Sequence, residues 1–322
     1  MSRRPPTVAL PTYNGARHLA EALRSILDQK GADYDLLVCD DRSEDDTIAI
    51  VRAEAGDLAR VEVNSERLGL AENWNRCVQR SETPFVAIFH QDDVMLPGHL
   101  AAHVNTLEQD ESLGMVCGAA EVIDDQGRPV PDSVVGRGNL GPIDRVFPPG
   151  AFVAELVESN PVRCSAVVLR KAAHAELGGF DPSYRYAVDW EFWLRLARRW
   201  AVAWRATPMV AIRWHEASET HRFKVGQADL DEVACLIDSV LERDKALLPD
   251  SRRSRSLANQ RLALAYVNRA YEATRSGDAG LARSCLRNAV RRRPAIVGQL
   301  LRDPRLAARL AGLLLAPGRA SR

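Results

Sequence analysis

The chain has 322 residues, of which 46% are hydrophobic and 27% charged, a composition typical of a globular protein with a substantial core. Its 43 basic and 43 acidic residues cancel, which argues against nucleic acid as the main partner. The six cysteines lie far apart and no pair has CxxC spacing, so we expect neither a zinc site of that type nor a disulfide framework. Free thiols of this kind suit a reducing cytoplasm.

The first 90 residues alternate between strand and helix patterns. Short apolar runs bounded by turn residues predict buried strands, and apolar residues at helical spacing predict amphipathic helices. Ser43 and Asp46 resemble a capping box, with Asp in place of Glu, before the second helix. This alternation predicts a doubly wound, largely parallel α/β sheet that binds ligands beyond the carboxyl ends of its strands. In chain order the predicted elements are strand 7–11, helix 17–29, strand 34–39, a helix ending near 55, strand 60–63, helix 70–80 and strand 84–89.

Residues 96–220 are less regular. The segment 124–150 is rich in Gly, Pro and Asp, which predicts a loop or flap. The remaining predicted elements are helices 97–109 and 186–198 and strands 114–120, 164–169, 201–204 and 209–214.

Beyond Val225 the pattern changes to successive helices at 229–247, 255–276 and 279–292, with Gly277 at a turn. The last two resemble a single tetratricopeptide-like helical hairpin, and one such unit is too few for a repeat array. We therefore expect two domains, an α/β domain at 1–222 and an all-helical C-terminal extension at 223–322.

The N-terminus lacks an apolar core for a signal peptide, and the apolar segment Leu306–Ala316 is too short to span a bilayer. We expect a cytoplasmic protein. The basic segment Arg283–Arg293, followed by the Leu-rich segment Leu300–Leu315, allows two interpretations. One is a peripheral contact with the inner face of the membrane, and the other is a solvated helix face beside a packed one.

Acidic pairs follow two of the predicted strands. Asp40 and Asp41 can accept hydrogen bonds from a nucleobase or ribose, or can be the acidic first turn of a helix. Asp92 and Asp93 can bind Mg²⁺ or Mn²⁺, which prefer oxygen ligands, or can form a solvated turn. Their position at strand ends favours the functional interpretation of both pairs.

Asp189 lies between Val188 and Trp190, and a carboxylate in such apolar surroundings is a candidate general base. The alternative is a helix-start Asp in a capping position. Glu191 is the neighbouring candidate, but on a helix it points about 200° away from Asp189.

His215 follows the last predicted strand and can ligate a metal or contact a phosphate, unless it is a surface or supporting residue. His221 is a weaker candidate. Arg67 can meet phosphates and Asn73 can orient a neighbouring loop, against the simpler interpretation of a surface Arg and a helix-face Asn.

Several enzyme classes lack their signatures in this sequence. There is no GxSxG nucleophile motif, and the absence of Walker A and GxGxxG patterns argues against NTPases and nicotinamide enzymes. A nucleotidyltransferase remains an alternative, although PTYNGAR is a poor phosphate loop. The second alternative is a non-catalytic binding module that uses its helical tail to recruit a partner.

Taken together, the blocks resemble the inverting family 2 glycosyltransferases, which have the GT-A fold, a mixed doubly wound sheet flanked by helices. The resemblance covers residues 7–220 and leaves out the last hundred. The matching blocks are VALPTYNGARHLAEALRSILDQ, LLVCDDRSEDDT, NSERLGLAENWNRC, PFVAIFHQDDVMLPGHL, GGFDPSYRYAVDWEFWLRL and IRWHEASET.

The resemblance implies a role for each matched position. Asp41 would bind the base of a UDP-, GDP- or dTDP-sugar, and Arg67 and Asp92 would also contact the donor. Asp93 and His215 would hold Mn²⁺ or Mg²⁺, with His90 standing where many members have the first Asp of a DxD motif. Asp189 would take a proton from a saccharide or lipid-linked acceptor in polysaccharide or glycolipid synthesis. The loop framing the base would be Pro11, Thr12 and Tyr13.

Overall fold

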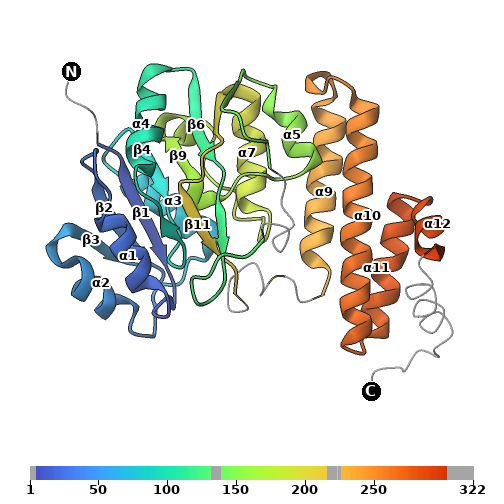
Figure 1. The fold of residues 1–322 in the computed structure, drawn as a ribbon, viewed down its shortest axis with the longest axis horizontal. Helices are drawn as coiled ribbons and strands as arrows, with labels where there is room; N and C mark the ends of the chain where they lie inside the picture. The colour runs from blue at the N-terminus through green and yellow to red at the C-terminus, as the bar shows by residue number, and fades with distance from the viewer. Residues whose placement is uncertain (1–4, 132–138, 216–222, 224–225, 303–322) are drawn as a thin grey trace. The chain divides into compact units, whose positions relative to one another are not determined.

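This computed structural model describes residues 5–131, 139–215, 223 and 226–302 of the chain (Figure 1). His221 and the apolar segment 306–316, both singled out in the sequence, lie outside these ranges. The chain divides into two compact units, residues 1–156 with 160–218 and residues 157–159 with 219–322. Each unit is described by itself.

The first unit is built on a mixed sheet in which the described residues form eight strands. The pairs β1–β2, β2–β3, β1–β4 and β6–β10 are parallel, whereas β9 runs antiparallel to both β4 and β6. The predicted doubly wound mixed fold is therefore confirmed. The strand order is β3 (Ala59–Val63), β2 (Asp35–Asp40), β1 (Thr7–Thr12), β4 (Phe85–Ile88), β9 (Val167–Arg170), β6 (Leu113–Gly118), β10 (Ala201–Arg205) and β8 (Arg145–Phe147).

A second, three-stranded sheet lies beside the first. It contains β5 (Val94–Met95), β11 (Val210–Arg213) and β7 (Glu121–Ile123). β11 pairs antiparallel with β5 and parallel with β7. This small sheet brings the ends of β7 and β11 next to the turn that follows β4.

Helices cover the main sheet (Figure 1). All six residues of β1 are buried, as expected for a central strand covered on both faces. Leu19, Leu23 and Ile26 of the first helix are fully buried in the same core as Val8 and Leu10 of β1. The helices are α1 (Leu19–Leu27), α2 (Thr47–Ala55), α3 (Leu70–Arg80), α4 (His99–Gln109), α5 (Phe152–Glu158), α6 (Lys171–Glu176) and α7 (Val188–Arg199).

The structure differs from the sequence-based expectation in several places, and α5, α6, β5 and β7 have no predicted counterpart. The predicted 124–150 loop contains the edge strand β8, which pairs with β10 and exposes much of its surface, so its apolar pattern is weak. The predicted strand 164–169 starts as the 3₁₀ turn Cys164–Ala166 and becomes extended only at Val167. The predicted capping box does not form, because Ser43 bonds to Asp40 and α2 begins at Thr47.

The second unit is helical, as the predicted C-terminal extension requires. It contains α9 (Ala228–Arg243), α10 (Ser251–Arg275), α11 (Ala279–Arg292) and α12 (Ile296–Leu301). Gly277 turns α10 into α11 with φ of 81°, a value that glycine adopts without strain. No helix in the described ranges combines the length and the hydrophobicity needed to cross a bilayer. All six cysteines are free thiols, and five of them are buried.

Candidate functional site

Three polar loops meet at one edge of the main sheet. They follow β1, β2 and β4, which are parallel neighbours, so their carboxyl ends lie together (Figure 1). Asn14 in the first loop and Arg42 in the second both have positive φ, which is uncommon outside glycine and concentrates at functional loops. The backbone N–H of Asn14 donates to Ser43 Oγ at 2.9 Å, and Glu44 N–H donates to the Asn14 side chain at 2.9 Å. The first two loops are therefore locked together.

Asp40 is fully buried and stabilises the junction of the first two loops. Its carboxylate accepts from Thr12 Oγ1 at 2.7 Å and from the backbone and hydroxyl of Ser43 at 2.8 and 2.6 Å. These bonds use the Asp40 oxygens within the protein. Pro11 and Thr12 are also buried, at the end of β1.

Asp41 points into the next loop along the chain and is 3% exposed. Its carboxylate accepts from the backbone N–H groups of Leu68 and Gly69 at 2.7 and 2.8 Å and from the Asn64 amide at 2.9 Å. Asn64 also donates to Asn73, at 3.0 Å. Asp41 therefore anchors the segment 64–69 that precedes α3.

Asn73 is buried, and besides contacting Asn64 it donates to the Cys39 carbonyl at 3.0 Å. These contacts fit the interpretation in which Asn73 orients a neighbouring loop. The sequence alone favoured the simpler interpretation of an Asn on a helix face. The anchored segment carries Arg67, whose guanidinium carbon lies 3.9 Å from the centre of the Tyr13 ring. A cation and an aromatic face are thus presented together beside Asp41.

Gln91 joins the first loop to the turn after β4. Its side-chain amide accepts from Tyr13 N–H at 3.0 Å and donates to the Tyr13 carbonyl at 3.1 Å. Gly15 permits this approach, because a β-carbon there would lie 2.1 Å from Gln91 Oε1. The sequence signalled only that Gln91 stood inside the HQDD block and gave no sign of this contact.

Asp92 and Asp93 occupy different environments in the turn after β4. Asp93 is 2% exposed, and its oxygens accept from Ser165 Oγ at 2.5 Å and from Arg213 N–H at 2.9 Å. Asp92 has a 23% exposed side chain, and its Oδ2 lies 3.0 Å from His215 Nε2. His215 thus contacts Asp92 and not the Asp93 carboxylate with which it was paired in the sequence-based assignment. His90, Asp92 and Asp93 form a group in which each side chain offers one possible metal-ligand atom, and these atoms lie within 4.8 Å of one another.

The two carboxyl groups have opposite pKa shifts. Burial alone would raise the pKa of Asp92, but the hydrogen bond with His215 and the charge of nearby His90 lower it. Burial and the adjacent Asp92 carboxylate raise the pKa of Asp93. Two crowded carboxyl groups with divergent pKa values mark this turn as a candidate functional site.

Arg213 is a buried residue that the sequence did not single out. Its guanidinium donates to the Asp92 carbonyl at 2.9 Å, to the Asp124 carbonyl at 3.1 Å and to Glu21 Oε2 at 2.6 Å. It therefore fixes the β4 turn against both the turn after β7 and helix α1. Its contacts with these distant segments depend on tertiary structure alone.

Asp189 lies in the first turn of α7 and is 8% exposed. Its carboxylate accepts from Asn160 Nδ2 at 3.3 Å and from the Trp190 N–H at 2.7 Å. Glu191 forms a bidentate ion pair with Arg195, at 2.6 and 2.7 Å. Of the two acidic residues considered in the sequence, Glu191 is occupied in fixing α7.

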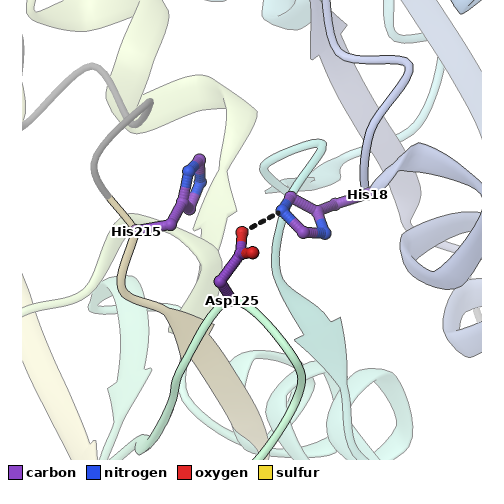
Figure 2. Close-up of side chains that lie close together, drawn as sticks. All are labelled: His18, Asp125 and His215. Carbon is purple, nitrogen blue, oxygen red and sulfur yellow. Dashed lines mark hydrogen bonds and ion pairs between the residues drawn. The ribbon is translucent and has the colours of Figure 1, made fainter.

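A second group of metal-ligating side chains lies near the first, and Figure 2 shows its three members. His18 precedes α1, Asp125 lies in the turn after β7, and His215 follows β11. His18 Nε2 lies 3.1 Å from Asp125 Oδ1, and the two imidazole rings are 5.1 Å apart, edge to face. Burial, Arg213 and His215 together lower the pKa of His18 despite its bond with Asp125.

Comparison with known proteins agrees with this architecture. The family model described as glycosyl transferase family 2 matches residues 7–172. An uncharacterised protein of Mycobacterium tuberculosis is 31% identical over 229 residues, 67% of this chain and 69% of that protein. The Escherichia coli UDP-Glc:alpha-D-GlcNAc-diphosphoundecaprenol beta-1,3-glucosyltransferase WfgD is 23% identical over 192 residues, 60% of this chain and 69% of that protein.

Among solved structures, Staphylococcus aureus TarS 1-349 in complex with UDP-GlcNAc superposes with a TM-score of 0.60. That likeness covers 95% of this chain and 87% of TarS 1-349 at 18% identity, so it supports the fold alone. The chain belongs to glycosyl transferase family 2.

Proposed function

We propose that the protein is an inverting glycosyltransferase that moves a sugar from a nucleoside-diphosphate sugar to an acceptor hydroxyl. The observation that carries this proposal is the position of the Asp92–Asp93 turn. Gln91 bonds that turn to the Tyr13 loop, and His215 bonds it to the end of β11. The proposed cation site and the proposed base-binding loop thus lie at one sheet edge, where this class of fold binds ligands.

The donor would lie across the loops after β1 and β2. Tyr13, with Pro11 and Thr12 behind it, would frame the base, and Asp41 would accept a hydrogen bond from it. Arg67, exposed on its stack with Tyr13, would meet the negative charge of the diphosphate. Because Asp41 already binds Leu68 and Gly69, it also sets where Arg67 stands.

Mn²⁺ or Mg²⁺ fits the residues at the end of β4. Two carboxylates and an imidazole are ligands that Mn²⁺ accepts, and the carboxylates suit Mg²⁺ as well. We propose Asp92 and Asp93 as carboxylate ligands, with His215 acting on Asp92 through their hydrogen bond. When bound, such a cation neutralises negative charge on the leaving diphosphate.

Asp189 would act as the general base. In a single displacement, the acceptor oxygen forms a bond to the anomeric carbon while the bond from that carbon to the diphosphate oxygen breaks. The hydroxyl proton passes to the Asp189 carboxylate, and the configuration at the sugar inverts. Asn160 would hold the carboxylate in position from the segment after α5.

The acceptor would be a saccharide or a lipid-linked saccharide used in bacterial polysaccharide or glycolipid synthesis. This part of the proposal is supported by the name of WfgD, a glucosyltransferase acting on a diphosphoundecaprenol-linked sugar. A protein acting on such a lipid would work at the inner face of the membrane.

Calorimetric titration with UDP, GDP and dTDP, each with and without Mn²⁺, tests the donor site. We expect one nucleotide to bind in a Mn²⁺-dependent manner, with at least a tenfold loss in Asp92→Asn and Asp93→Asn. Asp144→Asn is the matched control, because Asp144 pairs with Arg205 at the β8–β10 edge and belongs to neither acidic group. Folded protein that binds none of the nucleotides would favour the non-catalytic module instead.

The nucleotidyltransferase alternative is separated by its product. A glycosyltransferase releases a nucleoside diphosphate from the donor, whereas a nucleotidyltransferase releases pyrophosphate from a nucleoside triphosphate. Pyrophosphate release that persists in Asp189→Asn would overturn the proposed reaction.

A further inference from the structure

His18 and Asp125 are metal-ligating side chains that the proposed donor site does not use, and they lie beside His215, which bonds to Asp92 of that site. Two imidazoles and one carboxylate form a ligand set that binds divalent first-row metal ions, zinc in particular. Each residue offers a ligand atom, and these atoms lie within 4.8 Å of one another. Figure 2 shows the three side chains gathered from separate segments, with Asp125 between the imidazoles in that view.

The ring nitrogens of His215 give an independent indication that an ion binds at this group. Its side chain is 8% exposed, and its Nε2 bonds to Asp92. An ionised carboxylate can only accept, so a neutral His215 carries its proton on Nε2 and leaves a lone pair on Nδ1. That Nδ1 is buried and has no hydrogen-bond partner among the described residues.

The pairing of His215 with Asp92 has the form found behind metal-bound histidines. There, a carboxylate accepts from one ring nitrogen, fixes the tautomer, and makes the other nitrogen a stronger ligand. The Asp92 carboxylate can therefore ligate a cation at the β4 turn and also accept the hydrogen bond that orients His215 as a ligand.

The turn that carries Asp125 is fixed from two sides. Arg17 forms an ion pair with Asp125 Oδ2, which leaves Oδ1 toward His18. Arg213 donates to the Asp125 carbonyl at 3.3 Å and to the Asp124 carbonyl at 3.1 Å. The carboxylate is thus presented by anchored backbone.

We propose that His18, Asp125 and His215 form a second divalent-metal site, of the two-histidine, one-carboxylate type, that binds Zn²⁺. Two ligand atoms about 2.1 Å from a tetrahedral Zn²⁺ lie about 3.4 Å apart, so binding requires the three ligand atoms, now within 4.8 Å of one another, to move inward by about 1 Å. An ion there would tie the start of α1, the turn after β7 and the end of β11 together beside the donor site. The site does not depend on the proposed reaction.

The test uses the untagged full chain, freed of metal by a chelator and titrated with Zn²⁺ against a chromophoric competitor. We expect one Zn²⁺ equivalent, separate from any ion at Asp92 and Asp93, whose affinity falls at least tenfold in His18→Ala and in Asp125→Asn. Co²⁺ in place of Zn²⁺ should give visible d–d absorption in the wild type and lose it in both variants. Arg17→Gln is the matched control, since it removes the ion pair with Asp125 but keeps all three ligands.

The outcomes separate this site from the donor site. Mn²⁺-dependent nucleotide binding should persist in His18→Ala and Asp125→Asn, and circular dichroism should show both variants folded. Zn²⁺ affinity equal to wild type in both would overturn the proposal, as would a loss confined to Asp92→Asn and Asp93→Asn. Failure of nucleotide binding in every protein, with Zn²⁺ binding still dependent on His18, would sink the donor assignment and leave this site standing.

Discussion

The side-chain amide of Gln91 pairs with the backbone of Tyr13 through two hydrogen bonds, one donated and one accepted. These residues are 78 positions apart, and each lies in a loop at the end of a central strand. The Tyr13 loop and the acidic turn are therefore joined directly, and we expect a change in either to affect the other.

Replacing Gln91 with Ala should weaken that unit. Two hydrogen bonds are lost and two backbone groups of Tyr13 lose their partner, which should lower the free energy of unfolding by about 1–3 kcal/mol. We expect nucleotide affinity to fall about tenfold at the same time, measured by calorimetry on folded protein. Gln79→Ala, on the exposed side of α3, is the control. Equal affinity in both variants would show that the two loops are independent.

Asp41→Asn should displace the segment that carries Arg67. The amide keeps the shape of the carboxylate but loses the charge that three donors share, and hydrogen bonds to a charged group are the stronger kind. We expect a loss of about 2–4 kcal/mol in unfolding free energy, measured by urea denaturation. Asp46→Asn should change it by less than about 0.5 kcal/mol, because Asp46 is exposed and caps α2 without a side-chain bond. A similar effect of both variants would contradict the anchoring role.

Asp189→Asn separates catalysis from binding. Turnover should fall by about 10²–10⁴-fold, the usual contribution of a general base, while nucleotide affinity stays unchanged. The assay follows release of nucleoside diphosphate with the donor and acceptor that screening identifies. Glu191→Gln should instead lower stability through the Arg195 ion pair and retain turnover in the folded protein. Near-normal turnover in Asp189→Asn would remove this residue from the mechanism.

The buried imidazole of His174 should lower the free energy of unfolding in acid. Burial and the nearby charges of Arg195 and Lys171 lower its pKa from 6.5 to about 4, so the folded protein holds it neutral. The unfolded chain binds the proton more readily, and the stability present above pH 6.5 is lost as the pH falls toward 4. Between about pH 7.5 and about pH 5 this group alone should account for about 2 kcal/mol.

The matched variant for that measurement is His174→Gln, which retains a donor for Asn75 Oδ1. Urea denaturation at both pH values should show a smaller loss in His174→Gln than in the wild type, by about 2 kcal/mol. His99 and His103 are buried as well and their pKa values are also lowered, so the wild-type slope exceeds the part due to His174. An identical pH dependence of the free energy of unfolding in the two proteins would mean that folding does not lower the pKa of His174.

The sequence by itself determined the sheet, most of its helices and the loops that matter. Strands such as Thr7–Thr12 have a continuous apolar centre and are bounded by turns, so their composition and length indicate buried strands directly. The polar clusters at Asp41 and Asp92 could be placed at one edge because parallel strands end on the same side. The edge strand β8 escaped notice, since a strand paired on one side buries too little surface to leave a pattern.

Tertiary structure alone decided which side chains meet. Three of the contacting pairs lie far apart in the chain: Gln91 with Tyr13, Arg213 with Asp92, and His18 with Asp125. No periodicity in the local sequence indicates which residue is the partner. The different surroundings of the two acidic residues also depend on tertiary structure. Asp93 is buried against Ser165, whereas Asp92 faces His215. Hydrogen bonds and ion pairs depend on position to within a fraction of an ångström, which only the packed sheets supply.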